Sequence, residues 1–476
     1  MGKKPATGRR ASAPAGSGDP SFGYRALPGV ADEMVDTNGQ VRPVWKQLLS
    51  SINRLSAHEL SERMARADRY LRDAGVFYRA YGAQGSGERS WPISHIPVLI
   101  DDREWRGIAR GLVQRANLLE AVVADIYGEN RLVRDGFLPP ALVASNPEFL
   151  RPLVGVKPVG GHYLHFCSFE IGRGPDGNWW VLADRTQAPS GAGFALENRV
   201  ATTRAFSDIY AELHVHRLAS FFGAFRDTLQ TGRHSADDRI AVLTPGPANE
   251  TYFEHAYIAR YLGFMLLEGE DLIVVNDRVM VRTVAGLKPV SVLWRRLDAA
   301  YADPLELKQT SHIGTPGMVE ALRAGSVMIV NALGSGILET RAFLAFMPTI
   351  CRHLLGEDLS LPSVATWWCG QKAERAHVAE NIGKMVIGPA YSRLPFFDDN
   401  GQSVLGAKLR DEAQLSIGDW LESDGAKLVG QEAVTLSTTP ALVDGKLTPR
   451  PMSLRVYAAR TTNGWEIMPG GFARIG

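Results

Sequence analysis

The stretch that most constrains this chain is LADRTQAPSGAGFALENR, at residues 182–199. A short hydrophobic strand from Trp179 leads into it, and a Pro-Ser-Gly-Ala-Gly turn lies at its centre. Two carboxylates, a carboxamide and two guanidiniums surround the turn: Asp184, Glu197, Asn198, Arg185 and Arg199. Carboxylate and amide oxygens bind Mg²⁺, and arginine forks bind phosphate or carboxylate groups. The stretch therefore predicts a metal–phosphate site, and its alternative interpretation is a solvated loop with a surface ion pair.

Composition sets the class of protein. A chain of 476 residues is expected to form about two or three domains. Its 45% hydrophobic and 22% charged content is typical of a soluble globular protein. The net charge of +1 gives no electrostatic footprint for nucleic acid or an anionic membrane, and the apolar runs are too short to span a bilayer. We expect a cytoplasmic protein that binds neither nucleic acid nor membrane.

The three cysteines are scattered and form no CxxC motif. Cys167, Cys351 and Cys369 therefore indicate buried thiols in a reducing cytoplasm, without a disulfide framework or zinc site.

The N-terminal part predicts a leader followed by helices. Residues 1–40 are treated as a disordered leader, because their first half is basic and rich in Pro and Gly and lacks the apolar segment of a signal peptide. Helical spacing predicts one or two helices over residues 45–79 and a long amphipathic helix over residues 101–127. In the long helix, Arg106, Arg110 and Arg115 are expected on the solvated face, with the alternative that Arg115 turns toward a site.

The middle of the chain alternates strands, glycine loops and helices, which predicts an α/β unit with a parallel sheet. The strand at residues 290–294 ends in Arg295 and Arg296, which either bind an anion or are solvated. The strand at residues 326–330 ends in Asn331 and a glycine turn that includes Gly334, Ser335 and Gly336. Such a turn is a generic anion cradle and a weak signal alone.

The chain after Lys384 alternates strands around one helix, which predicts an α+β module that folds over a ligand as a lid. Just before it, Trp367 and Trp368 are expected in the core, the alternative being a stacking surface.

Eight motifs in order resemble the circularly permuted ATP-grasp family. They are ADRTQAPSGAGFALENR, LTPGPANETYFEHAYIARYLG, LEGEDL, WRRLDAAYADPLEL, NALGSG, LPSVATWWCG, GQEAVTLSTTP and MPGGFARIG, and the match spans roughly residues 78–476. The resemblance implies an α/β (α+β) fold, a circularly permuted ATP-grasp fold with an inserted pre-ATP-grasp-like α/β unit. It implies these units: a leader at 1–40, a helical region with the metal-binding part of the ATP-grasp core at 41–235, the α/β unit at 236–345, and the nucleotide-gripping subdomain at 346–476.

The resemblance also implies an activity, that of an ATP- and Mg²⁺-dependent carboxylate–amine ligase that acts through an acylphosphate. Asp184, Glu197 and Asn198 match the metal ligands, with Arg185 and Arg199 beside the γ-phosphate. The nucleotide would contact Gln431 and Glu432. The unit that holds acceptor or acylphosphate would comprise Arg295, Arg296, Asn331, Gly334, Ser335 and Gly336. A small-molecule or peptide substrate with carboxylate and amine groups is implied, and an alpha-helical partner protein is associated with such proteins.

The chain departs from the family pattern in two places. Glu197 and Asn198 are adjacent, where the family usually places these residue types two apart so that both point the same way along a strand. In a regular strand these two would point to opposite faces unless the backbone bulges, which leaves one ligand assignment open. Gly388 stands in VIGPA, where the family pattern resembles VIKPA with a phosphate-binding lysine. Lys384 and Arg393 are the two nearby cations that could replace that lysine.

Two alternative functions follow from these observations. Gly388 favours a degenerate, non-catalytic ATP-grasp scaffold that binds nucleotide or a partner protein. The tryptophan-rich LPSVATWWCG segment leaves a sugar- or peptide-binding protein as a third possibility.

Overall fold

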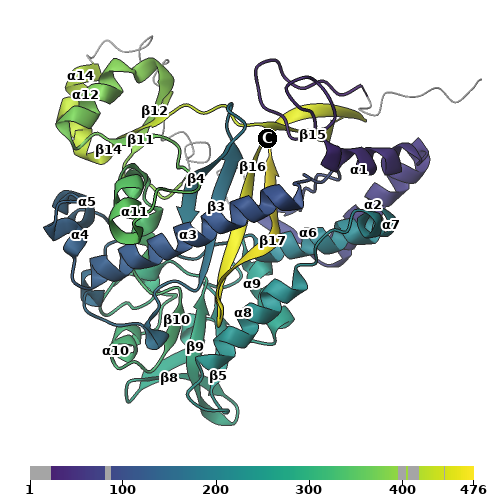
Figure 1. Ribbon diagram of the computed structural model, residues 1–476. Coiled ribbons are helices and arrows are strands. Elements are labelled where there is room, and N and C mark those ends of the chain that lie inside the picture. Colours follow the sequence, from purple (N-terminus) through teal and green to yellow (C-terminus); the bar gives the residue numbers. More distant parts are fainter. Residues whose placement is uncertain (1–22, 81–86, 395–403, 406–416, 444) are drawn as a thin grey trace, which may run out of the picture.

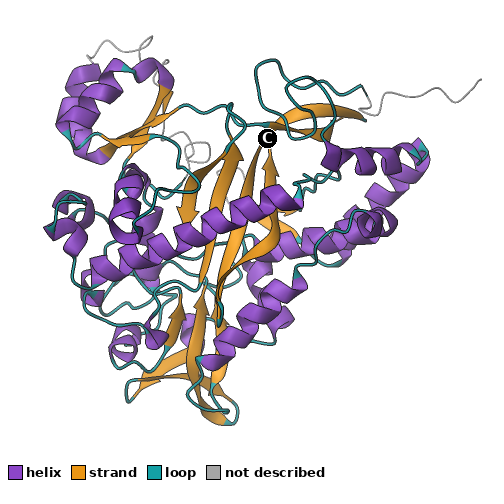
Figure 2. Ribbon diagram, in the orientation of Figure 1, coloured by secondary structure: helices purple, strands orange, loops and turns teal. Residues whose placement is uncertain are grey.

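An antiparallel sheet of five strands lies at the centre of the molecule (Figures 1 and 2). The computed structural model describes residues 23–80, 87–394, 404–405, 417–443 and 445–476. The central sheet contains β3 (Phe166–Arg173), β4 (Trp179–Arg185), β15 (Thr438–Val443), β16 (Lys446–Thr461) and β17 (Gly464–Ile475). The long strand β16 pairs with β3 on one edge and with β15 and then β17 on the other. Segments far apart in the sequence thus share one sheet.

Helices cover both faces of this sheet. Helix α3 (Asp102–Tyr127) crosses one face, where its buried stripe packs in a common core with Cys167, Phe169 and Val456. Helix α8 (Ala219–Thr231) lies on the other face, and its Phe225 packs against Phe166 at a centroid distance of 5.2 Å. Neighbouring residues of β3 therefore point into different cores, as the two-residue period of a strand requires.

A second sheet of six strands forms the α/β unit below the central sheet in Figure 1. Its strands are β5 (Arg239–Leu243), β6 (Met265–Leu267), β7 (Leu272–Val275), β8 (Arg278–Thr283), β9 (Gly286–Arg295) and β10 (Met328–Val330). β5 pairs in parallel with β6 and β9, and β10 pairs in parallel with β9. β7 and β8 extend the sheet as antiparallel hairpins. Helix α9 (Tyr252–Leu262) makes the crossover between β5 and β6.

A small third sheet stands at one corner of the molecule (Figure 1). It contains β11 (Thr366–Trp368), β12 (Met385–Pro389), β13 (Val404–Leu405) and β14 (Leu428–Glu432), flanked by α12 (Lys372–Glu380) and α14 (Ile417–Asp424). The unit expected over residues 346–476 is thus divided, because β15–β17 pair with the central sheet instead. Trp368 is buried in the core, as expected, whereas Trp367 is partly exposed and packs on His377.

The expected leader over residues 1–40 is wrong for its second half. Asp32 and Glu33 are buried, and the Glu33 N–H bonds to the carbonyl of Thr438, at the start of β15. Tyr24 donates a hydrogen bond of 2.6 Å to Asp32. This segment, the N-terminal strap (residues 24–41), packs because its acids find buried partners that composition does not reveal. Residues 1–22 lie outside the described residues.

The remaining elements are short or peripheral. Helix α2 (Ala57–Asp73) starts with a capping box between Ser56 and Glu59. The other α-helices are α1 (Pro43–Asn53), α4 (Arg131–Arg134), α5 (Pro140–Ala144), α6 (Ala192–Ala205), α7 (Ser207–Glu212), α10 (Met318–Arg323) and α11 (Met347–Leu355), with the hairpin β1 (Phe77–Ala80) and β2 (Gly87–Ser90). Among the described helices none has the length and apolarity needed to cross a membrane. The three cysteines are buried, free thiols.

The N-terminal strap gives the first prediction. Glu33 accepts hydrogen bonds from Arg173 Nε at 2.9 Å, Arg173 Nη2 at 3.0 Å and Ser437 Oγ at 2.7 Å. Glu33→Ala leaves the buried Arg173 short of a partner and should lower the free energy of unfolding by about 3 kcal/mol. Glu212→Ala, which removes an exposed pair with Arg54, is the control and should cost about 0–1 kcal/mol. Urea denaturation followed by circular dichroism measures both, and equal midpoints for the two variants would contradict the packing of the strap.

Candidate functional site

A narrow cleft lies between the central sheet and the small third sheet. We call it the intersheet cleft, and its lining is Leu182, Ala183, Asp184, Leu338, Glu339, Arg341, Leu344, Arg393, Leu394 and Gln431. It holds a cavity of only about 10 Å³. Asp184, Arg393 and Gln431 come from segments far apart in the sequence, and the fold brings these three predicted site residues together.

Asp184 is engaged by a buried arginine. Arg115 Nε and Nη2 donate to its two carboxylate oxygens at 2.5 and 2.7 Å, and both side chains are 1% exposed. Arg115 Nη1 donates to Ser363 at 3.0 Å. The expected solvated position of Arg115 is therefore wrong, because its side chain turns inward to Asp184. Arg115 follows Ile108 by two helical turns and so shares its apolar face, where the carboxylate compensates the buried charge.

Glu197 and Asn198 lie on helix α6, where the resemblance expected a strand. Glu197 accepts a hydrogen bond of 2.9 Å from Tyr70, and burial together with this bond raises the pKa of Tyr70 to about 12. Asn198 Oδ1 accepts one of 2.8 Å from Trp91. Neither residue shares a partner with Asp184.

The predicted metal ligands do not fit magnesium as the structure places them. Their oxygens are bound to an arginine, a tyrosine and a tryptophan, and the residues described contain no group of three or more His, Cys, Asp or Glu that could hold a metal ion. The prediction was wrong about the backbone after the glycine turn, because this segment forms helix α6 and not a strand.

The charges of the intersheet cleft form a paired network. Arg185 Nη1 donates to the carbonyl of Arg393 and lies 3.8 Å from Glu339. Burial lowers the pKa of Arg185. Arg393 bridges Glu148 at 3.0 Å and Asp298 at 2.8 Å. Burial opposes the charge on Arg393, but the hydrogen bond and charge of Asp298 raise its pKa overall.

Three charged residues in or near the cleft, Glu148, Glu339 and Arg341, were not identified by the sequence motifs. Burial raises the pKa of Glu148, and Glu339 accepts the N–H groups of Thr186 and Gln187 at 2.6 and 2.5 Å. Arg341 lines the cleft. Glu339 and Arg341 follow the NALGSG motif closely, and that proximity is the signal that could have pointed to them.

The small sheet presents one face to the cleft. Gln431 lines it and donates to Thr366 at 2.9 Å, whereas its neighbour Glu432 is exposed. Gly388 pairs with Val429, so it shares the face of Gln431. Of the two cations near Gly388, Arg393 lines the cleft, and Lys384 is exposed outside its lining.

Arg295 and Arg296 clamp the loop that follows β4. Arg295 Nη2 donates to the carbonyl of Gln187 at 2.9 Å, and Arg296 Nη1 donates to that of Pro189 at 2.7 Å. Burial lowers the pKa of Arg295 to about 10. Both arginines, which the sequence offered for anion binding, thus donate hydrogen bonds to backbone carbonyls.

The Asn331 turn is likewise tied to its surroundings. Asn331 Oδ1 accepts the N–H groups of His165 and Phe166, and its Nδ2 donates to Phe166 and Thr186. Ser335 Oγ donates to the carbonyl of Thr186 at 2.9 Å. A Cβ added to Gly336 would lie 2.5 Å from Glu148, and one added to Gly334 would lie 2.3 Å from the hydroxyl oxygen of Tyr127. These glycines permit close packing against side chains.

A carboxylate of the chain itself occupies the glycine turn at residues 189–193. Glu254 is fully buried and accepts the N–H groups of Gly191 and Gly193 at 2.8 and 2.9 Å. Arg296 lies 3.5 Å from it. The N-terminus of helix α6, which is the positive end of its dipole, therefore already binds an anionic group, the carboxylate of Glu254.

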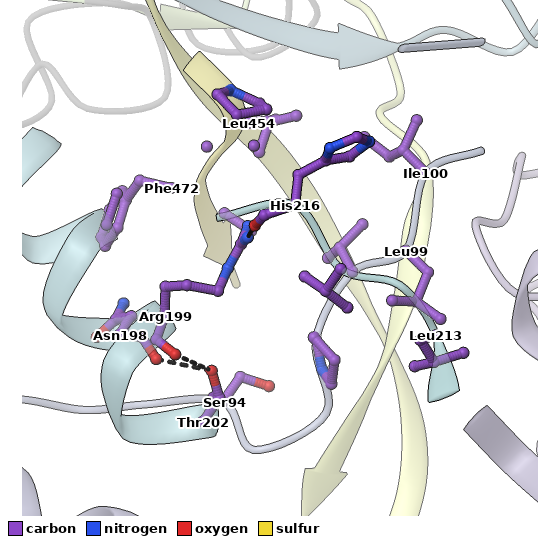
Figure 3. Close-up of a pocket in the computed structure, with 18 of the residues that line it drawn as sticks. Ser94, Leu99, Ile100, Asn198, Arg199, Thr202, Leu213, His216, Leu454 and Phe472 are labelled. Carbon is purple, nitrogen blue, oxygen red and sulfur yellow. Dashed lines mark hydrogen bonds between the residues drawn. The ribbon is translucent and has the colours of Figure 1, made fainter. Parts of the chain in front are cut away.

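Arg199 lies in a separate and larger cavity, which we call the α6 pocket. It is bordered by residues 92–102, helix α6, residues 210–216, the middle of β16 at Leu454 and the last part of β17, and it shares no lining residue with the intersheet cleft. Figure 3 shows the Arg199 side chain extending from α6 toward His216, to whose carbonyl it donates. Arg199 therefore does not join Asp184 and Arg185.

Comparison with known proteins identifies a family. The model of the family described as circularly permuted ATP-grasp type 2 matches residues 97–476. An uncharacterized protein of Mycobacterium tuberculosis is 33% identical over 465 residues, which cover 95% of this chain and 52% of that protein. The chain thus spans about half the length of this relative. An uncharacterized protein of Synechocystis is 31% identical over 93% of this chain and 92% of its own length.

One solved structure supports the same fold. A glutathione synthetase-like effector from Globodera pallida, in its apo form, superposes with a TM-score of 0.56 over 89% of this chain and 95% of its own. The sequence identity is 12%, so the likeness concerns the fold.

The Arg115–Asp184 pair gives the second prediction. Arg115→Gln leaves a buried carboxylate without its counter-ion and should lower the free energy of unfolding by about 3–5 kcal/mol. Arg110→Gln, on the exposed face of the same helix, should stay within about 0.5 kcal/mol of the parent. The double variant Arg115→Met with Asp184→Leu should recover most of the loss, since no unpaired charge remains. Thermal and urea unfolding measure all three, and a stability loss no greater for Arg115→Gln than for Arg110→Gln would refute the buried pair.

Proposed function

Since the chain belongs to the circularly permuted ATP-grasp type 2 family, we propose that it is an ATP-dependent ligase that joins a carboxylate to an amine. ATP would bind in the intersheet cleft. The observation that carries this proposal is the convergence of Asp184, Arg393 and Gln431 on that cleft. The family resemblance assigns such residues to the two halves of a permuted ATP site. Asp184 lies on β4 of the central sheet, Gln431 on β14 of the small sheet, and Arg393 in the loop after β12.

The proposed reaction has two steps. The γ-phosphoryl group passes from ATP to a carboxylate oxygen, which gives an acylphosphate and ADP. The amine nitrogen then attacks the acyl carbon, the amide forms, and inorganic phosphate leaves. No side-chain nucleophile takes part.

The arginines of the cleft suit the phosphates. Guanidinium groups bind phosphate oxygens by paired hydrogen bonds, and fixed charges in a dry site stabilise a transferring phosphoryl group. Arg393, which lines the cleft, and Arg185, whose Nη1 donates to the backbone carbonyl of Arg393, are the candidates here. These arginines would neutralise the negative charge of the phosphates. The proposal gives magnesium no role, because the predicted ligand set does not fit it.

Binding would require the cleft to open. A cavity of about 10 Å³ excludes a nucleotide. The small sheet lies at one corner of the molecule in Figure 1, so rigid-body movement of this corner is the simplest route. The acceptor would be a small molecule or peptide that carries carboxylate and amine groups, and an alpha-helical protein is the partner that the family resemblance suggests.

A second candidate function is a scaffold that binds nucleotide without turnover. Two observations favour it, namely the bidentate hold of Arg115 on Asp184 and the absence of a side chain at Gly388 on the face of Gln431. Such a protein would bind ATP and leave it intact.

The third prediction tests the site. Titration calorimetry should show ATP binding, and Arg393→Gln should weaken it at least tenfold, because a charge-assisted contact contributes about 1.5–3 kcal/mol. Arg352→Gln, an exposed arginine paired with Asp358, is the control. Equal ATP affinity of the parent and both variants would contradict ATP binding in the cleft.

The fourth prediction separates ligase from scaffold. ADP release, assayed over a panel of amino acids and small peptides with and without EDTA, should depend on an amine and a carboxylate if the chain is a ligase. Gly388→Lys places a cation on the cleft face and should raise ATP affinity in either case. Tighter binding with no ADP release under any condition would establish the scaffold.

A further inference from the structure

The α6 pocket is large and mostly apolar. Its volume is about 620 Å³, within the range of small-molecule sites. Figure 3 shows Leu99, Ile100 and Leu213 on one side of it and Phe472 on the other. The polar side chains of Ser94, Asn198, Thr202 and His216 also reach the lining. An apolar cavity with a few convergent polar groups is the usual form of a ligand site.

Arg199 is the one Lys or Arg among the described residues that line this pocket. Its Nη1 donates to the backbone carbonyl of His216, and it forms no ion pair with an acid in the described part of the chain. Burial lowers the pKa of its guanidinium, so the charged form lacks full solvation. A half-buried cation without a counter-ion favours an anionic ligand.

The acids of the lining already have partners. Asp101 caps helix α3 by accepting the N–H of Arg103 at 2.9 Å. Asp102 pairs with Arg106 at 3.1 Å and His216 at 3.3 Å. Both stand at the exposed start of α3, so neither supplies the charge that Arg199 lacks.

The MPGGFARIG motif shapes the wall beside Arg199. Gly470 has a φ of 144°, and a Cβ added there would lie 2.5 Å from Arg199 Nη2. A Cβ added to Gly471 would lie 2.6 Å from the carbonyl oxygen of Arg455. Gly470 thus makes room for the guanidinium against strand β17, a role that the intersheet cleft does not explain, whereas Gly471 permits the close pairing of β17 with β16.

We propose that the α6 pocket binds a small molecule with one carboxylate on an apolar body. The carboxylate would pair with Arg199, and the body would lie against Leu99, Leu213 and Phe472. A single cation matches a monoanion better than a phosphate dianion. The site is separate from the intersheet cleft. Trp105 lines the pocket, and it lies about 15 Å along α3 from Arg115, which binds the cleft residue Asp184. The proposal therefore goes beyond the proposed ligase activity.

The experiment compares acids with their neutral isosteres. The probes are a panel of phenylalkanoates and branched alkanoates, each beside its primary amide, measured on the full chain without nucleotide by ligand-observed NMR and calorimetry. At least one acid should bind at least tenfold more tightly than its amide. Absence of binding by every acid at about 1 mM, or equal affinity of each acid and its amide, would overturn the proposal.

Three variants locate the binding. Arg199→Gln should abolish the preference for the acid, and Leu213→Trp, which fills the cavity and keeps Arg199, should weaken acid and amide together. Arg204→Gln is the matched control, because Arg204 lies on the same helix and stacks on Tyr70. Thermal unfolding of each variant checks folding. Acid preference that survives Arg199→Gln, or affinity unchanged by Leu213→Trp, would place the probe elsewhere and refute the site. Since no cleft residue changes, these outcomes are independent of the ATP test.

Discussion

The buried ion pair between Arg115 and Asp184 is the interaction on which the candidate site depends. It joins the longest of the described helices to β4 at the place where the small sheet approaches. Removing one partner of a buried ion pair strongly destabilises the protein, because the remaining charge stays buried and cannot be hydrated. The pair therefore fixes helix and strand together, and it removes the most central predicted metal ligand from metal binding.

The loop after β4 is held with similar redundancy. Arg295 and Arg296 bind its carbonyls, Asn331 and Ser335 bind Thr186, and Glu254 fills its glycine turn. Four residues that the sequence offered for a ligand, Arg295, Arg296, Asn331 and Ser335, are thus used to hold one loop. A rigid loop between two sheets suits a site that must keep its geometry while the small sheet moves. Because these groups already bind partners within the chain, a scaffold that binds nucleotide without turnover is kept as the second candidate function.

Much of the fold could be predicted from the sequence, because it rests on local patterns. The 3.6-residue period predicted α3, and alternating strands and helices predicted the parallel strands around β5 and β9. The pairing of β16 with β3 and the buried strap at Asp32 and Glu33 could not be predicted, since neither leaves a local pattern. The site divides in the same way. Asp184, Arg393 and Gln431, which the sequence proposed for one site, line the same cleft, but the helix beginning at Ala192 carries Glu197 to Arg199 elsewhere. The propensity of ALENR for helix, with its Ala, Leu, Glu and Arg, was available and was outweighed by the expectation of a strand.

The central claim is that ATP binds between β4 and β14. The most direct test is a crystal structure of the full chain with a non-hydrolysable ATP analogue. The claim predicts the small sheet displaced from β4, the base beside Gln431 and the phosphates on Arg185 and Arg393. Phosphates bound at the glycine turn in place of Glu254, or in the α6 pocket on Arg199, would contradict it.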